Sequence, residues 1–129
     1  MNVSADKLAE VKAVSVAESF TTLQTARILD VSRTTIQRRR QDGKLYAFSY
    51  GQQWRYPAWQ FGAGSTIPGL EVVIPAITRS MHPAFVRGMM LAPRPRLAEH
   101  ELRESPRTFL INGGNPARVA AIFEELAAI

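Results

Sequence analysis

The fold is decided by residues 22–45, which read TLQTARILDVSRTTIQRRRQDGKL. Thr21 or Thr22 is placed to cap a first predicted helix over residues 22–29. Ser32 is placed to cap a second helix over residues 33–41. Asp30 lies in the turn between them, where the backbone must be left-handed, and aspartate tolerates that conformation better than most residues. Two short helices joined by such a turn predict a helix-turn-helix.

The spacing of the apolar residues in this stretch agrees with that prediction. Ala26 is small, which lets two helices cross closely, and Val31 and Ile36 are placed to fill the angle between them. Ala26 and Ile36 stand ten residues apart, with the turn residue four after the alanine. This is the separation that a helix-turn-helix requires.

The second helix presents one polar face. At about 100° per residue, the residues on it span an arc of roughly 140°, and Ile36 lies outside that arc. The members are Arg33, Thr34, Gln37, Arg38 and Gln41. No acidic residue occurs from Val31 to Gln41. Arginine pairs with guanine and glutamine with adenine through two hydrogen bonds each, so this face is suited to reading duplex DNA.

A β-hairpin is predicted after the second helix. Residues 45–50 have strand composition, Gly51-Gln52 forms a turn, and residues 53–56 return. The hairpin would act as a wing. Its four large apolar residues, Leu45, Phe48, Trp54 and Tyr56, are expected in the core, and a helical turn over residues 58–61 is expected to pack Trp59 and Phe61 onto it.

Charge is concentrated in the same third of the chain. Residues 20–61 carry seven basic and two acidic residues, a net charge of +5, whereas residues 62–129 carry +1 and residues 1–19 carry −1. A basic block of this kind favours a polyphosphate partner. We therefore expect contacts to double-stranded DNA from Ser32, Arg33, Thr34, Thr35, Gln37, Arg38, Arg40, Lys44, Gln52, Gln53 and Arg55.

Three segments are predicted overall, in a mainly α fold with a small β-hairpin wing. Residues 1–19 contain a helix over residues 3–18 that either packs on the domain or mediates dimerisation. Residues 20–62 form the winged helix-turn-helix, and Gly62-Ala-Gly-Ser-Thr reads as a linker. Residues 67–129 form a small helical domain. Its helices are expected over residues 70–77, 83–91, 106–111 and 116–128.

Residues 21–61 resemble the excisionase and MerR-like winged helix-turn-helix families. The resemblance rests on the two helices and on the Gly-Gln-Gln-Trp-Arg-Tyr wing at residues 51–56. The chain departs from those families at Asp30, where glycine is usual. The resemblance implies that the second helix reads duplex DNA.

The second half resembles the toxin-binding domain of antitoxins of the Xre/MbcA/ParS class. The matching stretches are Ile67-Pro-Gly-Leu, Leu-Ala-Pro-Arg-Pro-Arg-Leu at residues 91–97 and SPRTFLINGGNPARV at residues 105–119. That class usually carries a different helix-turn-helix in front. The resemblance implies a homodimeric repressor of its own operon with a toxin partner, often a small RES-type NAD-degrading enzyme. The expected partner-binding residues are Arg107, Phe109, Asn115, Arg118, Phe123 and Ile129.

Other classes of function find little support. The chain has no cysteine, which excludes disulfides and cysteine-based metal sites. His82 and His100 are 18 residues apart, so no metal site and no cofactor are expected. An enzyme ranks last, because paired acids and a nucleophile context are missing. No membrane segment is predicted, and we expect a cytoplasmic, nucleoid-associated protein. A stand-alone regulator and an excisionase-type architectural factor remain alternatives to the antitoxin.

Overall fold

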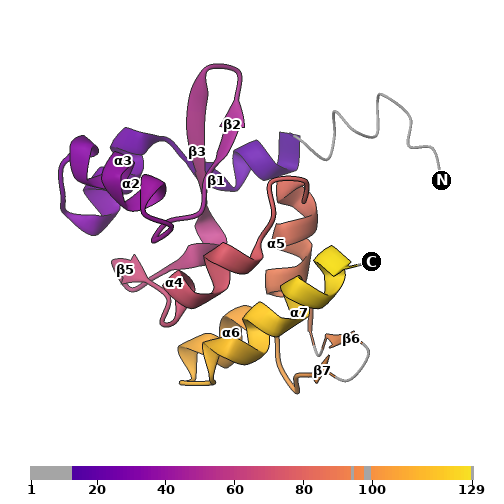
Figure 1. Cartoon of the computed structure of the whole chain (residues 1–129). Helices are drawn as coiled ribbons and strands as arrows, with labels where there is room; N and C mark the ends of the chain where they lie inside the picture. The colour runs from indigo at the N-terminus through magenta and orange to yellow at the C-terminus, as the bar shows by residue number, and fades with distance from the viewer. Residues whose placement is uncertain (1–12, 94, 98–99, 129) are drawn as a thin grey trace.

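The computed structural model describes residues 13–93, 95–97 and 100–128. Two helices and a projecting β-hairpin form the upper part of the molecule in Figure 1, and the helices of the second half pack below them. The helix predicted over residues 3–18 falls largely outside the described residues, within which residues 13–17 are helical. None of the described helices is long and apolar enough to span a membrane.

The helix-turn-helix forms with the predicted bounds, α2 at Thr22–Leu29 and α3 at Arg33–Gln41. Thr21 Oγ1 accepts from the Gln24 backbone N–H at 3.1 Å, and the Gln24 side chain accepts from the Thr21 N–H at 2.9 Å. This reciprocal pair is a capping box. Asp30 has φ 54° and ends α2, while Ser32 Oγ caps α3 by accepting from a backbone N–H at 3.1 Å. The caps and the turn are therefore confirmed.

The residues predicted to pack between the two helices lie in a common core, which we call the reader core. It consists of Ala26, Ile36, Leu45, Tyr56 and Phe61, with Val31 half-buried at its edge. Ile36 and Tyr56 are fully buried. Phe48, also expected there, is half-buried outside this core, and Trp54 does not belong to it either, because 40% of its surface is exposed. Its assignment to the core was wrong: Trp54 shares a strand face with Tyr56 but lies nearer the hairpin tip, beyond the end of the core.

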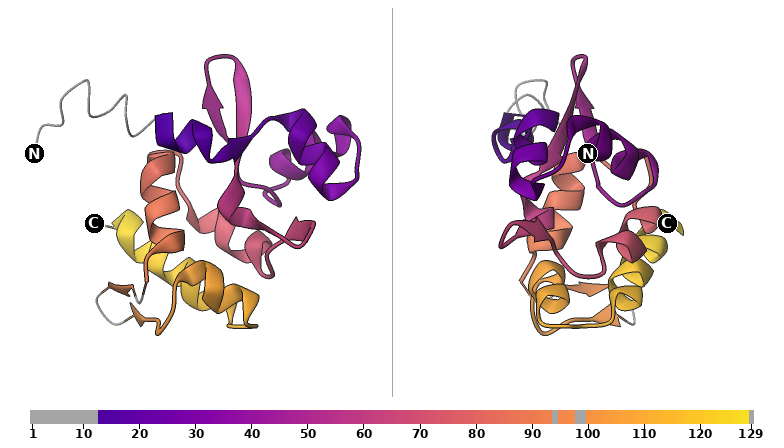
Figure 2. Two further views of the ribbon diagram at one scale, coloured as in Figure 1. Left: turned by 180° about the vertical axis from the view of Figure 1, so that it is seen from behind. Right: turned by 90° about the vertical axis from the view of Figure 1, so that its left-hand side faces the viewer.

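The wing is an antiparallel hairpin of β2 (Phe48–Tyr50) and β3 (Gln53–Pro57), which projects from the body (Figure 2). β1 (Ser19–Phe20) pairs with the far side of β3 and completes a three-stranded sheet. The first wing strand begins three residues later than predicted. The reason is that the backbone of Tyr46 bonds to a side chain rather than to a strand.

That side chain is the fully buried Gln60. Its Oε1 accepts from the Tyr46 N–H at 2.9 Å, and its Nε2 donates to the Tyr46 carbonyl at 2.7 Å and to the Pro57 carbonyl at 3.2 Å. Gln60 ends the 3-10 turn η1 (Ala58–Gln60). Because the oxygen and the nitrogen of this buried amide are both bonded, it fixes the backbone at Tyr46, just before the wing.

The predicted linker is instead a tight hairpin. β4 (Phe61–Gly62) pairs with β5 (Ser65–Thr66), and the turn residues Ala63 and Gly64 have φ of 53° and 78°. Small residues and glycine serve a flexible linker and a left-handed turn alike, so composition did not separate the two.

The second half is helical, as predicted. It contains α4 (Leu70–Val73), the 3-10 turn η2 (Ile74–Ala76), α5 (Pro83–Leu91), α6 (Pro106–Ile111) and α7 (Pro116–Ala128). Short strands β6 (Arg96–Leu97) and β7 (His100–Glu101), which were not predicted, pair between α5 and α6. His82 Nδ1 caps α5 by accepting from the Ala84 N–H at 3.0 Å. The helices enclose a second core, which we call the helical core and which includes Leu70, Val86, Met90, Leu110 and Phe123.

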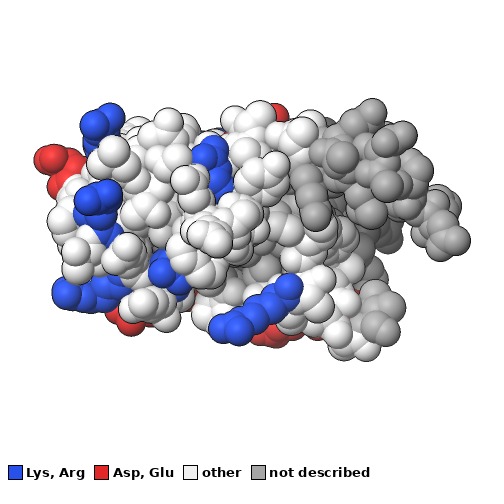
Figure 3. Space-filling view, turned by 90° about the horizontal axis from the view of Figure 1, so that it is seen from above, with Lys and Arg blue, Asp and Glu red and all other residues white. Residues whose placement is uncertain are grey.

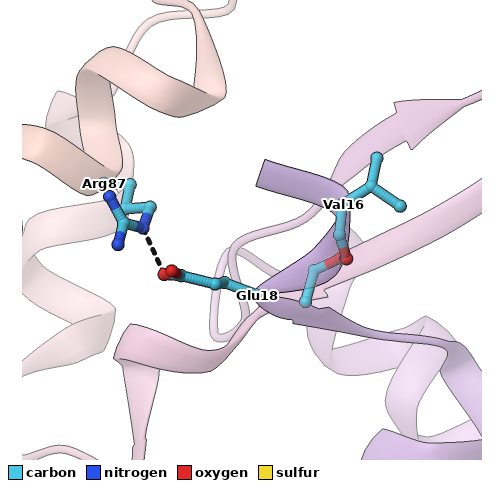
Figure 4. A network of polar contacts seen from close by, with 4 residues as sticks. Val16, Glu18 and Arg87 are labelled. Atoms are coloured by element: carbon cyan, nitrogen blue, oxygen red, sulfur yellow. Dashed lines mark hydrogen bonds and ion pairs between the residues drawn. The ribbon is translucent and has the colours of Figure 1, made fainter. Parts of the chain in front are cut away.

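Several contacts join the two halves. Trp59 was expected on the first core but lies in the helical core. Arg107 on α6 donates from Nε to the Trp59 carbonyl and from Nη2 to the Phe61 carbonyl, both at 2.8 Å. Arg87 on α5 forms an ion pair with Glu18, which precedes β1 (Figure 4). The two halves are thus packed against each other.

One glycine offers a test of this packing. Gly69 has φ 78°, and a Cβ there would lie 2.6 Å from Pro116 Cβ at the start of α7. Gly113 has φ 86° with open space around it. Gly113→Ala should lower the free energy of unfolding by about 1–2 kcal/mol through backbone strain alone. Gly69→Ala should lose about 1–3 kcal/mol more, because Pro116 must move. Urea unfolding followed by circular dichroism measures both, and equal losses would show that α7 does not pack on Gly69.

Candidate nucleic-acid interface

The orientation of α3 follows from its one apolar anchor. Ile36 is fully buried in the reader core, so the opposite side of the helix faces solvent. All five residues of the predicted polar face are exposed, namely Arg33, Thr34, Gln37, Arg38 and Gln41. Ser32 is exposed and Thr35 half-buried, and their hydroxyl oxygens lie 2.9 Å apart within the helix cap. The structure therefore brings the predicted residues of α3 together on one accessible surface.

Basic side chains surround this surface. α3 has no acidic residue and carries Arg38, Arg39 and Arg40 in its last turn. Lys44 is exposed just beyond the helix. Seen from above, Lys and Arg side chains are spread over the end of the molecule that bears the helix-turn-helix, with the few acidic side chains in view near the margins (Figure 3). Such a field attracts a polyanion over a wide area.

Arg40 is held against the wing. Its guanidinium carbon lies 4.0 Å from the centroid of the Trp54 ring, the geometry of a cation–π contact. Arg40 is half-buried, and its Nε is buried without a hydrogen-bond partner among the described residues. The last turn of α3 and strand β3 are linked by this contact. Trp54 was not predicted to belong to the site. It lies two residues nearer the hairpin turn than Tyr56, and this position could have indicated that its side chain is exposed.

The wing presents only part of its predicted contact set. Gln52 and Gln53 are exposed at its tip, as predicted. Arg55 is turned toward the start of the chain instead. Its Nε donates to Ser19 Oγ at 2.9 Å, and its Nη2 donates to the Val16 carbonyl at 3.0 Å and to the Ser19 carbonyl at 2.9 Å. Arg55 therefore ties residues 16–19 to β3, and the guanidinium that was predicted to contact DNA is engaged within the chain.

The predicted partner-binding residues are dispersed. Phe123 is 1% exposed in the helical core, and Arg107 is engaged with the backbone of residues 59 and 61, so neither forms a free surface. Arg118 is exposed, donates to the Glu101 carbonyl at 2.8 Å and stacks on the half-buried Phe109. Asn115 is exposed, and its side-chain oxygen accepts from the Ala117 N–H at the start of α7. Ile129 lies outside the described residues.

The part of the chain that the structure describes contains no group of three or more His, Cys, Asp or Glu side chains placed to hold a metal ion. The surface around α3 instead carries hydrogen-bond donors and positive charge. That combination binds phosphates and base edges.

Comparison with known proteins agrees with this geometry. Residues 19–61 match a family described as a helix-turn-helix domain. The match covers β1, α2, α3 and the wing, and it ends before the helical second half. The comparisons with curated proteins and with solved structures each found no match. Residues 19–61 therefore form a helix-turn-helix domain of the kind found in DNA-binding regulators, and the chain beyond residue 61 has no counterpart in these comparisons.

Proposed function

We propose that the protein is a sequence-specific DNA-binding regulator whose helix α3 lies in the major groove. The observation that carries this proposal is the exposed polar face of α3 opposite the buried Ile36. An α-helix fits the major groove, where Arg33 and Gln37 would bond to base edges and the methyl group of Thr34 would contact thymine. Arg38, Arg40 and Lys44 would contact phosphates and fix the position of the helix.

We further propose that the regulator is a homodimer that represses its own operon. Proteins that place one such helix in the major groove gain affinity and specificity by pairing two half-sites about one helical turn apart. A two-fold dimer on a palindromic operator is the arrangement that meets this requirement. A repressor acts by occupying such an operator, so DNA binding alone is sufficient for repression.

The second half suggests the biological setting. An architectural factor of the excisionase type would need little more than residues 19–61, whereas here a comparable length of helices encloses its own core. We propose that this half binds a partner and, from its resemblance to antitoxins of the Xre/MbcA/ParS class, that the partner is a toxin of the RES type. Asn115 and Arg118 remain accessible for this contact. The alternative is a stand-alone regulator without a toxin.

DNA reading is tested by selecting duplexes from a random pool with the full chain. The pool should converge on a palindrome. Arg33→Ala and Gln37→Ala should each lose about 1–3 kcal/mol of discrimination between the selected duplex and a scrambled one, because each removes a base-edge contact. Arg118→Ala on α7 is the matched control and should behave as wild type. A DNase footprint on the selected site that Arg33→Ala leaves unchanged would contradict the role of α3.

Substitution of Arg40 should affect DNA binding, whereas substitution of Arg55 should affect stability. Arg40→Ala should weaken binding to every sequence and reduce the slope of log affinity against log salt by about 0.9, as expected for one lost phosphate contact. Arg55→Ala should leave that slope unchanged. It should instead lower the free energy of unfolding by about 2 kcal/mol, because bonds from a charged donor to Ser19 and Val16 are lost. Fluorescence anisotropy across a salt series and urea unfolding give the two readouts, and the reverse pattern would refute the assignment.

The antitoxin role is tested in cells with the full chain. Expression of each open reading frame adjoining its gene would identify a product that arrests growth, and co-expression of this protein should restore growth. Arg118→Glu should abolish the rescue while DNA binding persists, because Arg118 is on the exposed side of α7. Exposed Arg103→Glu is the charge-matched control. If no neighbouring product is toxic, or if rescue is absent, the protein is a stand-alone regulator.

A further inference from the structure

A groove continues the recognition surface beyond the end of α3. It has a volume of about 840 Å³. From the reader side it is lined by Arg40, Gln41 and Trp54, and from the second half by Ile77, Thr78 and Arg79. Gln41 belongs both to the exposed face of α3 and to this groove. A duplex seated on α3 therefore lies at the opening of the groove.

The electrostatics of the groove favour an anion. Arg40 lines it from the reader side and Arg79 from the second half, and none of the described residues that line it is Asp or Glu. Tyr46 forms part of the wall, and burial raises the pKa of its phenol to about 12. A tyrosine phenol is uncharged at neutral pH even at its ordinary pKa, so it adds no negative charge to the groove. The remaining walls are apolar or hydroxylated. An occupant that alternates anionic and apolar groups matches them, and the phosphates and deoxyriboses of a DNA strand alternate in this way.

Local structure positions the guanidinium of Arg40 and the backbone of Arg79. The guanidinium of Arg40 is stacked on Trp54. Arg79 lies in a tight turn in which the Met81 N–H donates to the Thr78 carbonyl at 3.1 Å and the hydroxyls of Thr78 and Ser80 lie 2.9 Å apart. This turn presents the exposed Arg79 toward solvent between η2 and α5. An arginine from each half of the chain at one groove is suited to binding a phosphate backbone.

We propose that this groove binds the sugar–phosphate backbone of the duplex whose bases α3 reads, and that Arg79 is a phosphate contact supplied by the second half. The proposal rests on the proposed function. It makes the helical half part of the DNA interface, although that half was assigned from sequence to a protein partner alone. Trp54 acts here as a positioning residue, which holds Arg40 at the groove.

The first test measures salt dependence with a labelled duplex of random sequence and the full chain. Arg79→Ala should reduce the slope of log affinity against log salt by about 0.9, which corresponds to an affinity about eight-fold weaker at ~0.1 M salt than the wild type. Trp54→Leu should reduce the affinity for every sequence, and this loss should vanish in an Arg40→Ala background, because Trp54 acts through Arg40. Arg103→Ala, an exposed arginine outside the groove, should leave the slope unchanged.

The second test locates the strand. The chain has no cysteine, so Thr78→Cys provides a unique attachment point for an iron chelate that cleaves nearby DNA. Cleavage beside the site occupied by α3 supports the groove, and exposed Ala117→Cys on α7 should give none. Wild-type affinity and slope for Arg79→Ala, with no cleavage from residue 78, would overturn the groove while leaving DNA reading by α3 intact. Weaker binding of a polyglutamate peptide by Arg79→Ala, with duplex affinity unchanged, would assign the groove to an acidic protein segment and equally overturn the proposal.

Discussion

The burial of Ile36 is the constraint on which the DNA-binding surface depends. Its side chain is fully enclosed in the reader core, and an isoleucine buried in this way stabilises a fold by about 1.5–3 kcal/mol. Its directional effect matters more than its energy. Because each residue of a helix is rotated by about 100° from the last, one buried position fixes where all the others point. Arg33, Gln37, Arg38 and Gln41 are turned outward together because Ile36 is turned inward.

A second constraint joins this reader to the helical half. The side chain of Gln60 bonds to the backbone N–H and carbonyl of Tyr46. Arg107, from the helical half, donates to the carbonyls of Trp59 and Phe61 on either side of Gln60. Buried polar groups that are bonded in this way stabilise one arrangement over its alternatives, because a shift would leave them unpaired. The wing, α3 and the turn at Arg79 therefore keep a fixed relation to one another. That relation lets two segments far apart in sequence serve one binding surface.

Sequence alone predicted the features that local chemistry determines. The helix starts at Thr21 and Ser32 were found because a capping side chain bonds to a backbone N–H only three residues further along the chain. The left-handed Asp30 and the exposed face of α3 were found for the same reason. The roles of Arg55 and Arg107 could not be found, because the partners of Arg55 lie 36 to 39 residues away in the chain and those of Arg107 lie 46 to 48 residues away. An arginine that bonds to a distant carbonyl has the same local sequence as one that faces a phosphate.

The central claim is that α3 reads duplex DNA, and amide chemical-shift mapping of the full chain tests it most directly. The protein would be titrated with its selected duplex at moderate salt. The account predicts that the largest shifts fall on Arg33–Gln41 and on the wing around Gln52 and Gln53, while the buried helical core around Phe123 stays unperturbed. Shifts confined to α6 and α7, with α3 unchanged at saturating duplex, would contradict it.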